Sequence, residues 1–294
     1  MYASTRYRLE NLLGRLLVHS ILILVSLACF MPLMLIIAAS FTNDQALAEH
    51  GYTFWPTQFS TYAYEYVLTD APKVLQAYGI TIFITVVGSI AALLVMALLA
   101  YALSRRALRV RKALSFYVFF TLLFSGGLVP TYILITQILQ MRNTLPVLIL
   151  PIMVVPTWVL ILRTYFLSLP DELLDAARID GAGEWRIFFQ VVMPLSTPAL
   201  ATIGLFAVLM YWNDWYLALL YVDDPNLYPL QYYLYTVLSN INFLSAGSQS
   251  LGITPPAQSA RMALTVLAIG PIIFAAVFAH RYFVRGVTLG ALKD

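Results

Sequence analysis

The sequence predicts an all-α, polytopic membrane protein with six transmembrane helices and both termini in the cytoplasm. Of its 294 residues, 61% are hydrophobic and only 11% are charged, whereas soluble domains average about 45–50% and ~25%. A soluble fold of this size could not hide so much apolar surface from water, so lipid must solvate much of the chain. These proportions exclude a soluble enzyme, a disordered regulator and a nucleic-acid-binding protein with a basic, water-facing surface.

Six apolar runs are long enough to cross a bilayer, which takes roughly 20 mostly apolar residues. They span approximately Leu16–Ser40, Tyr78–Leu103, Leu114–Leu139, Leu145–Leu162, Ala199–Tyr221 and Met262–His280. The fourth is the shortest and carries Pro146, Pro151 and Pro156, so we expect a kinked helix there. The first is too long for a signal peptide and is followed by no small-residue cleavage site, so we expect a retained helix.

The basic residues predict the orientation of these helices. Fourteen of the 17 lysines and arginines fall in alternate segments, namely the two termini and the second and fourth connections. Because cytoplasmic segments carry the excess of basic residues, both termini are predicted to be cytoplasmic. The cytoplasmic set comprises Arg6, Arg8, Arg15, Arg105, Arg106, Arg109, Arg111, Lys112, Arg163, Arg178, Arg186, Arg281, Arg285 and Lys293.

Charged residues are almost absent from the predicted helices, and Asp214 is the one acidic residue well inside a span. Ionisable groups at membrane depth are costly and often functional. We nevertheless expect Asp214 to lie near the outer interface, in an aromatic belt with Trp212, Trp215 and Tyr216. The alternative is that Trp212, Asn213 and Asp214 belong to a translocation path. Such sparse charge argues against a proton or ion relay, so energy for uphill transport would have to come from elsewhere.

Motifs of catalysis are missing from the sequence. None of the three lysines follows a glycine, as the lysine of a phosphate-binding loop must. The histidines form no zinc-binding pattern, and no nucleophile elbow of the Gly-x-Ser-x-Gly type occurs. The single cysteine, Cys29, lies in an apolar run and offers no internal disulfide and no cysteine-based metal cluster. We expect no enzymatic activity and no cofactor bound by this chain.

A charged segment between the fourth and fifth spans predicts a cytoplasmic helix, a glycine break and a second helix. Ser168 is predicted to cap the first helix, with Pro170 in its first turn. Gly181 and Gly183 are predicted to end it. The second helix begins near Glu184.

The second helix is predicted to present one apolar face. Trp185, Phe188, Phe189 and Val192 fall at positions i, i+3, i+4 and i+7. Such a face suits a linker that lies on the lipid headgroups. It equally suits docking into a groove on a cytoplasmic partner, and periodicity leaves both interpretations open.

A motif in this segment resembles the EAA loop of binding-protein-dependent ABC importer permeases. Asp175-Ala-Ala is followed after three residues by Gly181, and Met193-Pro194-Leu195 comes later. The family has glutamate where this chain has Asp175, which keeps the charge but shortens the reach by one methylene. The resemblance implies that the segment couples to a separate ATPase. The implied coupling residues are Leu173, Leu174, Asp175, Ala176, Ala177, Asp180, Gly181, Ala182, Trp185 and Arg186.

Four further stretches resemble the maltose-permease-like carbohydrate branch of that family, and within it the LplC/YtcP-type subgroup. These are residues 124–131, 212–215, 227–231 and 281–293. The resemblance implies a type I ABC importer transmembrane domain, with residues 1–294 as a single domain. Within it lie a coupling loop at 168–195 and a cytoplasmic tail at 284–294 that reaches toward the ATPase in the family.

The implied function is that of a permease subunit, multi-pass in the cytoplasmic (inner) membrane, which forms half of a translocation pathway. The importer would be ATP-driven and would carry oligosaccharides, including acidic ones such as alginate oligosaccharides. Its implied partners are a second homologous permease, an ATPase dimer that carries ATP and magnesium, and an extracytoplasmic solute-binding protein, with no nucleic acid. An ion-coupled secondary transporter is the alternative, and a membrane scaffold without transport is a third class.

Two long connections are predicted to lie outside the cell membrane, Phe41–Ala77 and Val222–Arg261. Connections of this length are usually functional, and both are rich in aromatic residues, which suit interfaces and the apolar faces of sugar rings. We expect them to form a docking surface for the binding protein rather than a direct sugar site. The candidate docking residues are Tyr228, Tyr232, Tyr233 and Tyr235.

Overall fold

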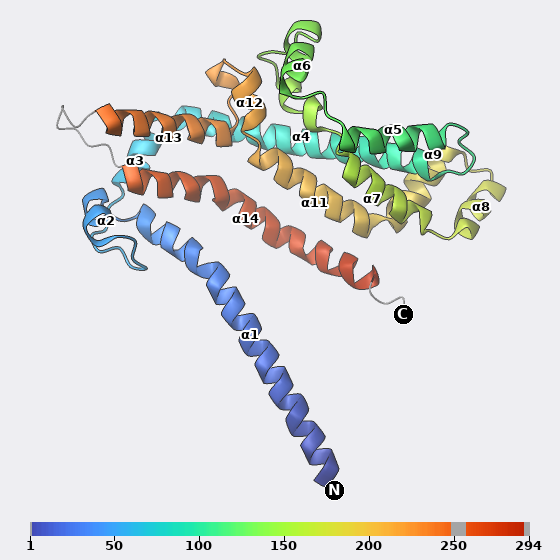
Figure 1. Cartoon of the computed structure of the whole chain (residues 1–294), viewed down its shortest axis with the longest axis horizontal. Coiled ribbons are helices and arrows are strands. Elements are labelled where there is room, and N and C mark those ends of the chain that lie inside the picture. Colours follow the sequence, from blue (N-terminus) through green and yellow to red (C-terminus); the bar gives the residue numbers. More distant parts are fainter. Residues whose placement is uncertain (1, 248–256, 291–294) are drawn as a thin grey trace. The chain divides into compact units, whose positions relative to one another are not determined.

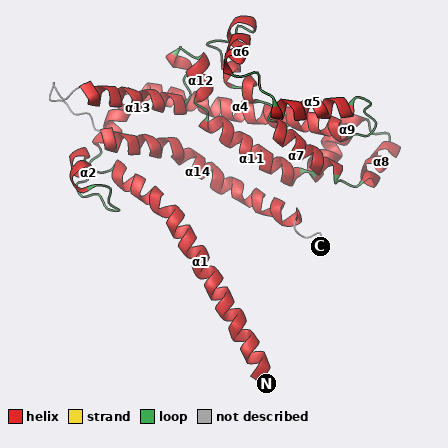
Figure 2. Cartoon of the chain, in the orientation of Figure 1, coloured by secondary structure: helices red, strands yellow, loops and turns green. Residues whose placement is uncertain are grey.

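The computed structural model describes residues 2–247 and 257–290 of the chain. Within these residues the fold consists of helices and connections and contains no β-strand (Figure 2). One isolated antiparallel bridge joins Thr42 to Phe59. The predicted all-α class is therefore confirmed for the described part of the chain.

The helices follow one another in the order shown in Figure 1. The longer ones are α1 (Tyr2–Ser40), α4 (Ala71–Ser104), α5 (Arg111–Leu123), α7 (Pro156–Leu167), α11 (Thr197–Asn213), α13 (Leu230–Gly247) and α14 (Ala257–Gly290). The shorter α-helices are α2 (Asp44–His50), α3 (Tyr62–Val67), α6 (Leu128–Ile133), α8 (Asp171–Ile179), α9 (Glu184–Ile187), α10 (Met193–Leu195) and α12 (Tyr216–Tyr221). The 3₁₀ turns are η1 (Leu68–Asp70), η3 (Leu145–Leu148), η4 (Leu150–Ile152) and η6 (Pro225–Leu227), and the π-helical turns are η2 (Leu134–Ile138) and η5 (Phe188–Val192).

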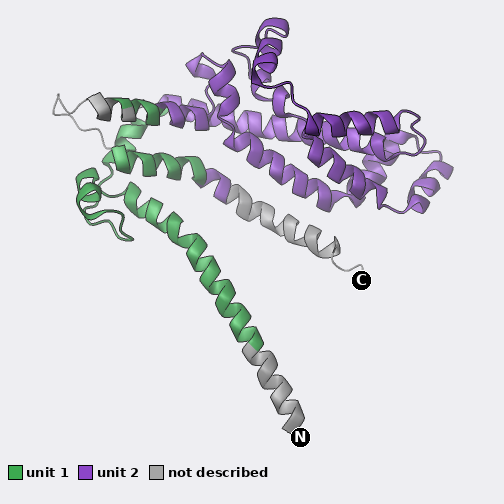
Figure 3. Ribbon diagram, viewed as in Figure 1, with its two compact units in different colours: residues 1–71, 237–269 green, residues 72–236, 270–294 purple. Residues whose placement is uncertain are grey.

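The chain divides into two compact units, coloured separately in Figure 3. Unit 1 comprises Met1–Ala71 and Val237–Ile269, and unit 2 comprises Pro72–Thr236 and Gly270–Asp294. Lys293 lies outside the described residues, as do the side chains of Arg6, Arg8, Arg281 and Arg285.

In unit 1, the first short helix after α1 is joined to the start of α14 by a carboxylate. Asp44 accepts hydrogen bonds from the backbone N–H groups of Gln258 (2.8 Å) and Ser259 (2.9 Å) and from the Ser259 hydroxyl (3.2 Å). These N–H groups belong to the first turn of α14, where no intrahelical acceptor exists, and a negative charge there also complements the helix dipole. Asp44 thus caps a helix that begins more than two hundred residues later.

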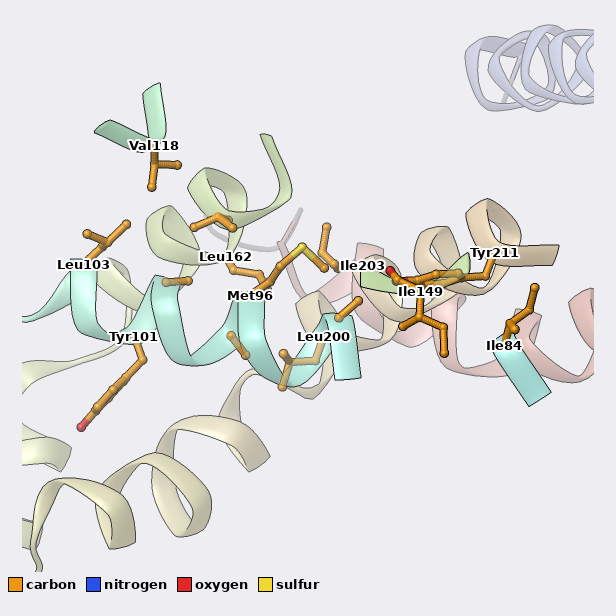
Figure 4. Close-up of a cluster of buried hydrophobic side chains, with 14 of the residues drawn as sticks. Ile84, Met96, Tyr101, Leu103, Val118, Ile149, Leu162, Leu200, Ile203 and Tyr211 are labelled. Atoms are coloured by element: carbon orange, nitrogen blue, oxygen red, sulfur yellow. The ribbon is translucent and has the colours of Figure 1, made fainter. Parts of the chain in front are cut away.

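Unit 2 is built around α4, whose buried positions include a stripe of small residues. Gly88, Ser89, Ala92, Ala97 and Ala100 are all buried. Small side chains let neighbouring helices approach closely where no hydrophobic effect drives association, as in a bilayer. Larger side chains fill the space around this stripe, and Figure 4 shows ten of them labelled: Ile84, Met96, Tyr101, Leu103, Val118, Ile149, Leu162, Leu200, Ile203 and Tyr211.

A tight contact in this core joins α4 to α11. A Cβ atom added to Gly88 would lie 2.8 Å from two ring carbons of Tyr211. The Tyr211 side chain is completely buried, and its hydroxyl donates to the carbonyl of Ile149 at 2.9 Å. Because the ring is held at both ends, only a glycine fits opposite it.

The third apolar run is not the continuous span that the sequence predicts. It forms two helical segments, Arg111–Leu123 and Leu128–Ile138, bent by 113° relative to one another. The break lies at the glycine pair before α6, where Gly127 adopts φ +85°, a conformation open to glycine at no steric cost. The hydropathy averaged over the whole run does not predict this turn.

The fourth run is bent, as its prolines predict. Its two segments, Leu145–Ile152 and Pro156–Leu167, meet at 55°. The fifth differs from expectation, because α11 ends at Asn213 and α12 begins only at Tyr216. Asp214 therefore lies between two helices and not inside one.

Both segments predicted as external connections contain helices. Within Phe41–Ala77 lie α2, α3 and the start of α4, and within Val222–Arg261 lies the 18-residue helix α13. Polar residues are mixed with aromatic ones in these segments and lower their mean hydropathy. A hydropathy scan for membrane spans therefore does not detect the helices. The predicted tail also begins in a helix, since α14 extends to Gly290, and residues 291–294 lie outside the described part.

Two described helical stretches, Gly14–Ser40 and Ala71–Ser104, are long and apolar enough to cross a membrane as single helices. The count among the described residues rises to five if each bent pair is one span, and the apolar stretch Ala257–Ile273 of α14 is shorter.

Candidate partner-coupling site

The predicted coupling segment forms α8 and α9 at one end of unit 2, beside the end of α4 (Figure 1). Asp171 and Glu172 lie in the first turn of α8, where acidic side chains are favoured. The predicted cap is wrong, because Pro170 occupies the N-cap position and Ser168 instead ends α7, donating its hydroxyl to the Tyr165 carbonyl at 2.7 Å. The short Leu169-Pro170 connection leaves Ser168 too early to reach α8.

Gly181 ends α8, as predicted, through a complete Schellman motif. The N–H of Ala182 donates to the Ala177 carbonyl at 2.9 Å, and the N–H of Gly181 donates to the Arg178 carbonyl at 3.0 Å. Gly181 has φ +79°, in the left-handed region that favours glycine. This turn sets the direction in which the chain enters α9.

The second helix does not present its four apolar side chains on one face. Phe188 and Val192 are buried, whereas Trp185 is 68% and Phe189 48% exposed. The reason is the π-helical turn η5, whose wider hydrogen-bond spacing changes the angular position of successive side chains. The two exposed rings of Trp185 and Phe189 stack on each other with centroids 6.1 Å apart.

Four large apolar side chains of α8, α9 and η5 are exposed, and we refer to them together as the coupling surface. Its members are Leu173, Ile179, Trp185 and Phe189. Leu174, Ile187 and Phe188 point the other way and are almost fully buried, so they anchor the segment to the unit. Large exposed apolar side chains such as the stacked rings of Trp185 and Phe189 are typical of interaction sites.

The structure places the other predicted coupling residues around this surface. Exposed are Asp175, Ala176, Asp180, Gly181 and Arg186, and half-buried are Ala177 and Ala182. Leu174 differs from the expectation of a contact residue because its side chain is only 2% exposed.

Charged groups connect α8 and α9. Arg178 forms ion pairs with Asp175 (2.9 Å) and with Glu184 (3.3 Å). The Tyr101 hydroxyl, from the last turn of α4, donates to the other oxygen of Glu184 at 2.6 Å. This hydrogen bond lowers the pKa of Glu184, partial burial opposes it, and Arg178 lowers the pKa further. Glu184 is therefore ionised at neutral pH.

Sequence reasoning did not select Tyr101, Arg105 or Glu184 as site residues. Tyr101 contacts Glu184, and the Arg105 guanidinium carbon lies 4.1 Å from the centroid of the Tyr101 ring. A usable signal was the position of Tyr101 one turn before the basic run that follows α4.

The candidates for a translocation path lie at the junction of α11 and α12. The Trp212 side chain is buried within the unit. Asn213 is exposed, and its amide donates to the Leu209 carbonyl at 2.8 Å. Asp214 accepts from the Leu217 N–H at 3.3 Å and so caps the start of α12.

Three of the four candidate docking tyrosines lie in one chain of ring contacts with Trp215. Tyr228 contacts Tyr232, Tyr232 stacks with Tyr235, and Tyr235 stacks on Trp215 with centroids 5.0 Å apart. Tyr235 and Trp215 are the exposed members, whereas Tyr232 is buried. Tyr233 is half-buried.

An ion pair and an asparagine fix the connection before η6. Arg142 pairs with Asp223 at 2.8 Å, and this contact lowers the pKa of the Asp223 carboxyl. The Asn143 side-chain oxygen accepts from the N–H groups of Asp223 (2.6 Å) and Asp224 (3.2 Å). Asn143 itself adopts φ +56°, which asparagine tolerates better than most residues.

Comparison with known proteins identifies the family. Residues 79–289 match the family described as "binding-protein-dependent transport system inner membrane component". The polygalacturonan/rhamnogalacturonan transport system permease protein YtcP of Bacillus subtilis (strain 168) is 36% identical over 292 residues, covering 97% of this chain and 100% of the relative. Protein LplC of the same organism is 37% identical over 265 residues, covering 90% and 89% of the two chains.

A solved structure has the same fold. It is a bacterial ABC transporter involved in the import of the acidic polysaccharide alginate, and one of its chains superimposes with a TM-score of 0.79. That chain is 28% identical, and the match covers 91% of the present chain and 95% of the other. The chain described here therefore belongs to the family of binding-protein-dependent transport system inner membrane components, the membrane-embedded permeases of ABC importers.

Proposed function

We propose that this chain is a permease subunit of an ATP-driven oligosaccharide importer. It would form half of the translocation pathway together with a second, homologous permease. The coupling surface carries the proposal, because exposed Trp185 and Phe189 on a segment anchored by buried side chains suit a groove on a cytoplasmic protein. That protein would be the ATPase dimer, which would bind the ATP and magnesium.

Asp175 has a structural role in this proposal. Its carboxylate is 2.9 Å from Arg178, which also pairs with Glu184. We propose that Asp175 helps to order the turn around Gly181, so that α8 and α9 meet the ATPase as one body. The shorter side chain relative to the family's glutamate suffices for this internal contact.

We propose six membrane spans with both termini in the cytoplasm. The spans would be α1, α4, the bent pair Arg111–Leu123 with Leu128–Ile138, the bent pair Leu145–Ile152 with Pro156–Leu167, α11 with α12, and α14. The excess of basic residues in alternate segments supports this orientation.

Thiol labelling tests this topology. In a Cys29→Ser background, Asn226→Cys should react with a membrane-impermeant maleimide in intact cells, whereas Asp180→Cys should react only after the membrane is opened. Both residues are exposed in the structure. Labelling of the two sites from the same side would contradict the six-span arrangement.

The external segments Phe41–Ala77 and Val222–Arg261 would bind the solute-binding protein. In unit 2 the exposed rings of Trp215 and Tyr235 support this role, and the Arg142–Asp223 ion pair would stabilise the adjoining connection. Asn213 and Asp214 lie close in sequence to this surface and would face the pathway at its outer end.

The substrate class that we propose is an oligosaccharide of acidic sugars. YtcP is named for polygalacturonan and rhamnogalacturonan, and the solved relative imports alginate. An arabinooligosaccharide permease of Halalkalibacterium halodurans, 32% identical over 270 residues, represents the neutral alternative.

Substrate-stimulated ATP hydrolysis tests the proposed function. The full importer, reconstituted in proteoliposomes with its solute-binding protein, is offered oligogalacturonates, alginate oligosaccharides and arabinooligosaccharides in separate assays. We expect one of the two acidic series to stimulate hydrolysis and to be taken up. Stimulation by arabinooligosaccharides alone would contradict the acidic class. Uptake that needs an ion gradient but neither ATP nor partner subunits would contradict the importer and indicate a secondary transporter.

A further inference from the structure

One directional polar contact joins the coupling segment to the helix that forms the centre of unit 2. The Tyr101 hydroxyl donates to a carboxylate oxygen of Glu184, the first residue of α9, at 2.6 Å. The Tyr101 side chain is only 7% exposed, and its ring packs against Phe188 with centroids 5.1 Å apart. Figure 4 shows this ring pointing away from α4 at the end of the core.

Glu184 also connects this contact to α8. Its second oxygen lies 3.3 Å from Arg178, which pairs at 2.9 Å with Asp175. These ion pairs are largely exposed, so each contributes little to stability. The effect of these contacts is geometric. The Glu184 carboxylate of α9 contacts Tyr101 of α4 through one oxygen and Arg178 of α8 through the other, and so relates the positions of the three helices.

The surroundings of this contact leave room for movement. A cleft of about 430 Å³ separates the end of α4 from α8, with Arg105 and Asp171 among its lining residues. Two guanidinium nitrogens of Arg105, Nε and Nη2, are buried without a hydrogen-bond partner, while the guanidinium rests on the Tyr101 ring at 4.1 Å. These two nitrogens therefore add no hydrogen bond that would hold the end of α4 in place.

The segment also contacts the unit through buried apolar side chains. Leu174, Ile187 and Phe188 are buried, and hydrophobic contacts of this kind are non-directional. Apolar side chains can slide past one another, whereas a short hydrogen bond to a charged acceptor maintains one relative position. A displacement of α9 reaches α4 most directly through the Tyr101–Glu184 contact.

We propose that Tyr101 is a positioning residue that transmits movement of the coupling segment to α4. This inference rests on the proposed docking of the ATPase at the coupling surface. Tyr101 would not touch the ATPase or the transported sugar. Its hydroxyl would act through Glu184, so that closure of the ATPase dimer displaces the central helix of unit 2.

The test uses Tyr101→Phe in the full importer complex and measures amide hydrogen exchange with and without ATP and vanadate. The phenylalanine keeps the ring that packs on Phe188 and removes only the hydroxyl. We expect the ATP-dependent change at α8 and α9 to persist. At the Tyr101–Ser104 amides the change should be about tenfold smaller, the factor that one hydrogen bond to a charged group supplies.

Matched variants separate transmission from a general structural effect. Tyr117→Phe removes the hydroxyl of an exposed tyrosine on α5 and should leave the exchange pattern unchanged. Glu184→Ala should reproduce the effect of Tyr101→Phe, and the double variant should add little to either single change, because the two groups act through one contact. Glu184→Gln keeps an acceptor for Tyr101 and should retain most of the response at α4.

The outcomes distinguish this inference from the proposed function. If the wild-type complex responds at α8, α9 and α4, and Tyr101→Phe responds identically, the inference is overturned while the ATPase docking stands. Additive effects of Tyr101→Phe and Glu184→Ala would overturn it as well. If the wild-type complex shows no ATP-dependent change at α8 and α9, the docking site itself is overturned and the inference with it.

Discussion

Trp185→Asp is expected to reduce ATP-driven uptake about hundredfold, because a tryptophan anchor at an interface contributes about 3 kcal/mol. The side chain is 68% exposed and stacks on Phe189 at the surface, so its replacement leaves no cavity inside the unit. An aspartate there would place an unpaired charge in the groove of the ATPase. The measurement is ATP-driven uptake in proteoliposomes, together with the amount of ATPase that co-purifies.

The control for this prediction is Trp185→Phe, which keeps an aromatic ring next to Phe189 and should retain most of the activity. A Trp185→Asp complex that still co-purifies with its ATPase and transports normally would contradict docking at the coupling surface. It would favour the alternative that the sequence left open, a segment lying on the lipid headgroups.

Gly88→Ala is expected to lower the free energy of unfolding of the subunit by about 2–3 kcal/mol through overpacking. The new methyl group would lie 2.8 Å from the Tyr211 ring, which is completely buried and tethered to Ile149. The ring cannot turn away without losing this hydrogen bond, so the two helices must separate instead. A thermal denaturation of the purified subunit in detergent should show a midpoint lower by roughly 5–10 °C.

Gly204→Ala is the matched control, since it adds the same methyl group on α11, the other helix of this pair. There the new atom would lie 3.4 Å from the end of the flexible Leu93 side chain, a contact that a small shift accommodates. Both changes carry the same gain in helix propensity, so their difference reports the packing at Tyr211. Equal midpoints for the two variants would contradict the close contact between α4 and α11.

The sequence predicts this fold well wherever a uniformly apolar composition extends over a whole helix. Leu16–Ser40 and Tyr78–Leu103 lie inside α1 and α4, because uniform hydropathy marks both. It predicts less where backbone geometry decides. The turn at Gly127 and the gap between α11 and α12 interrupt runs whose hydropathy, averaged over the length of a span, stays apolar.

The coupling segment shows the same division. The position of Gly181 predicts the end of α8, because a left-handed residue at a helix end leaves a local signature in the sequence. Phe188 and Val192 are buried whereas Trp185 is exposed, and this difference depends on a π-helical turn. A helical period of 3.6 residues does not predict such a turn. The contact between Tyr101 and Glu184 joins residues 83 positions apart, and nothing local in either stretch predicts the pairing.

The capping of α14 by Asp44 has a consequence for biosynthesis. Unit 1 is assembled from Met1–Ala71 and Val237–Ile269, and the 165 residues Pro72–Thr236 are made between its two parts. At about 5–20 residues per second, the ribosome needs roughly ten to thirty seconds for that stretch. Throughout this interval α1 has no partner from the later part of its own unit, and only 6% of its most apolar window is buried even in the finished chain. The first helix must therefore persist in the bilayer as an independent insertion, and the last helix completes the unit only when translation is nearly over.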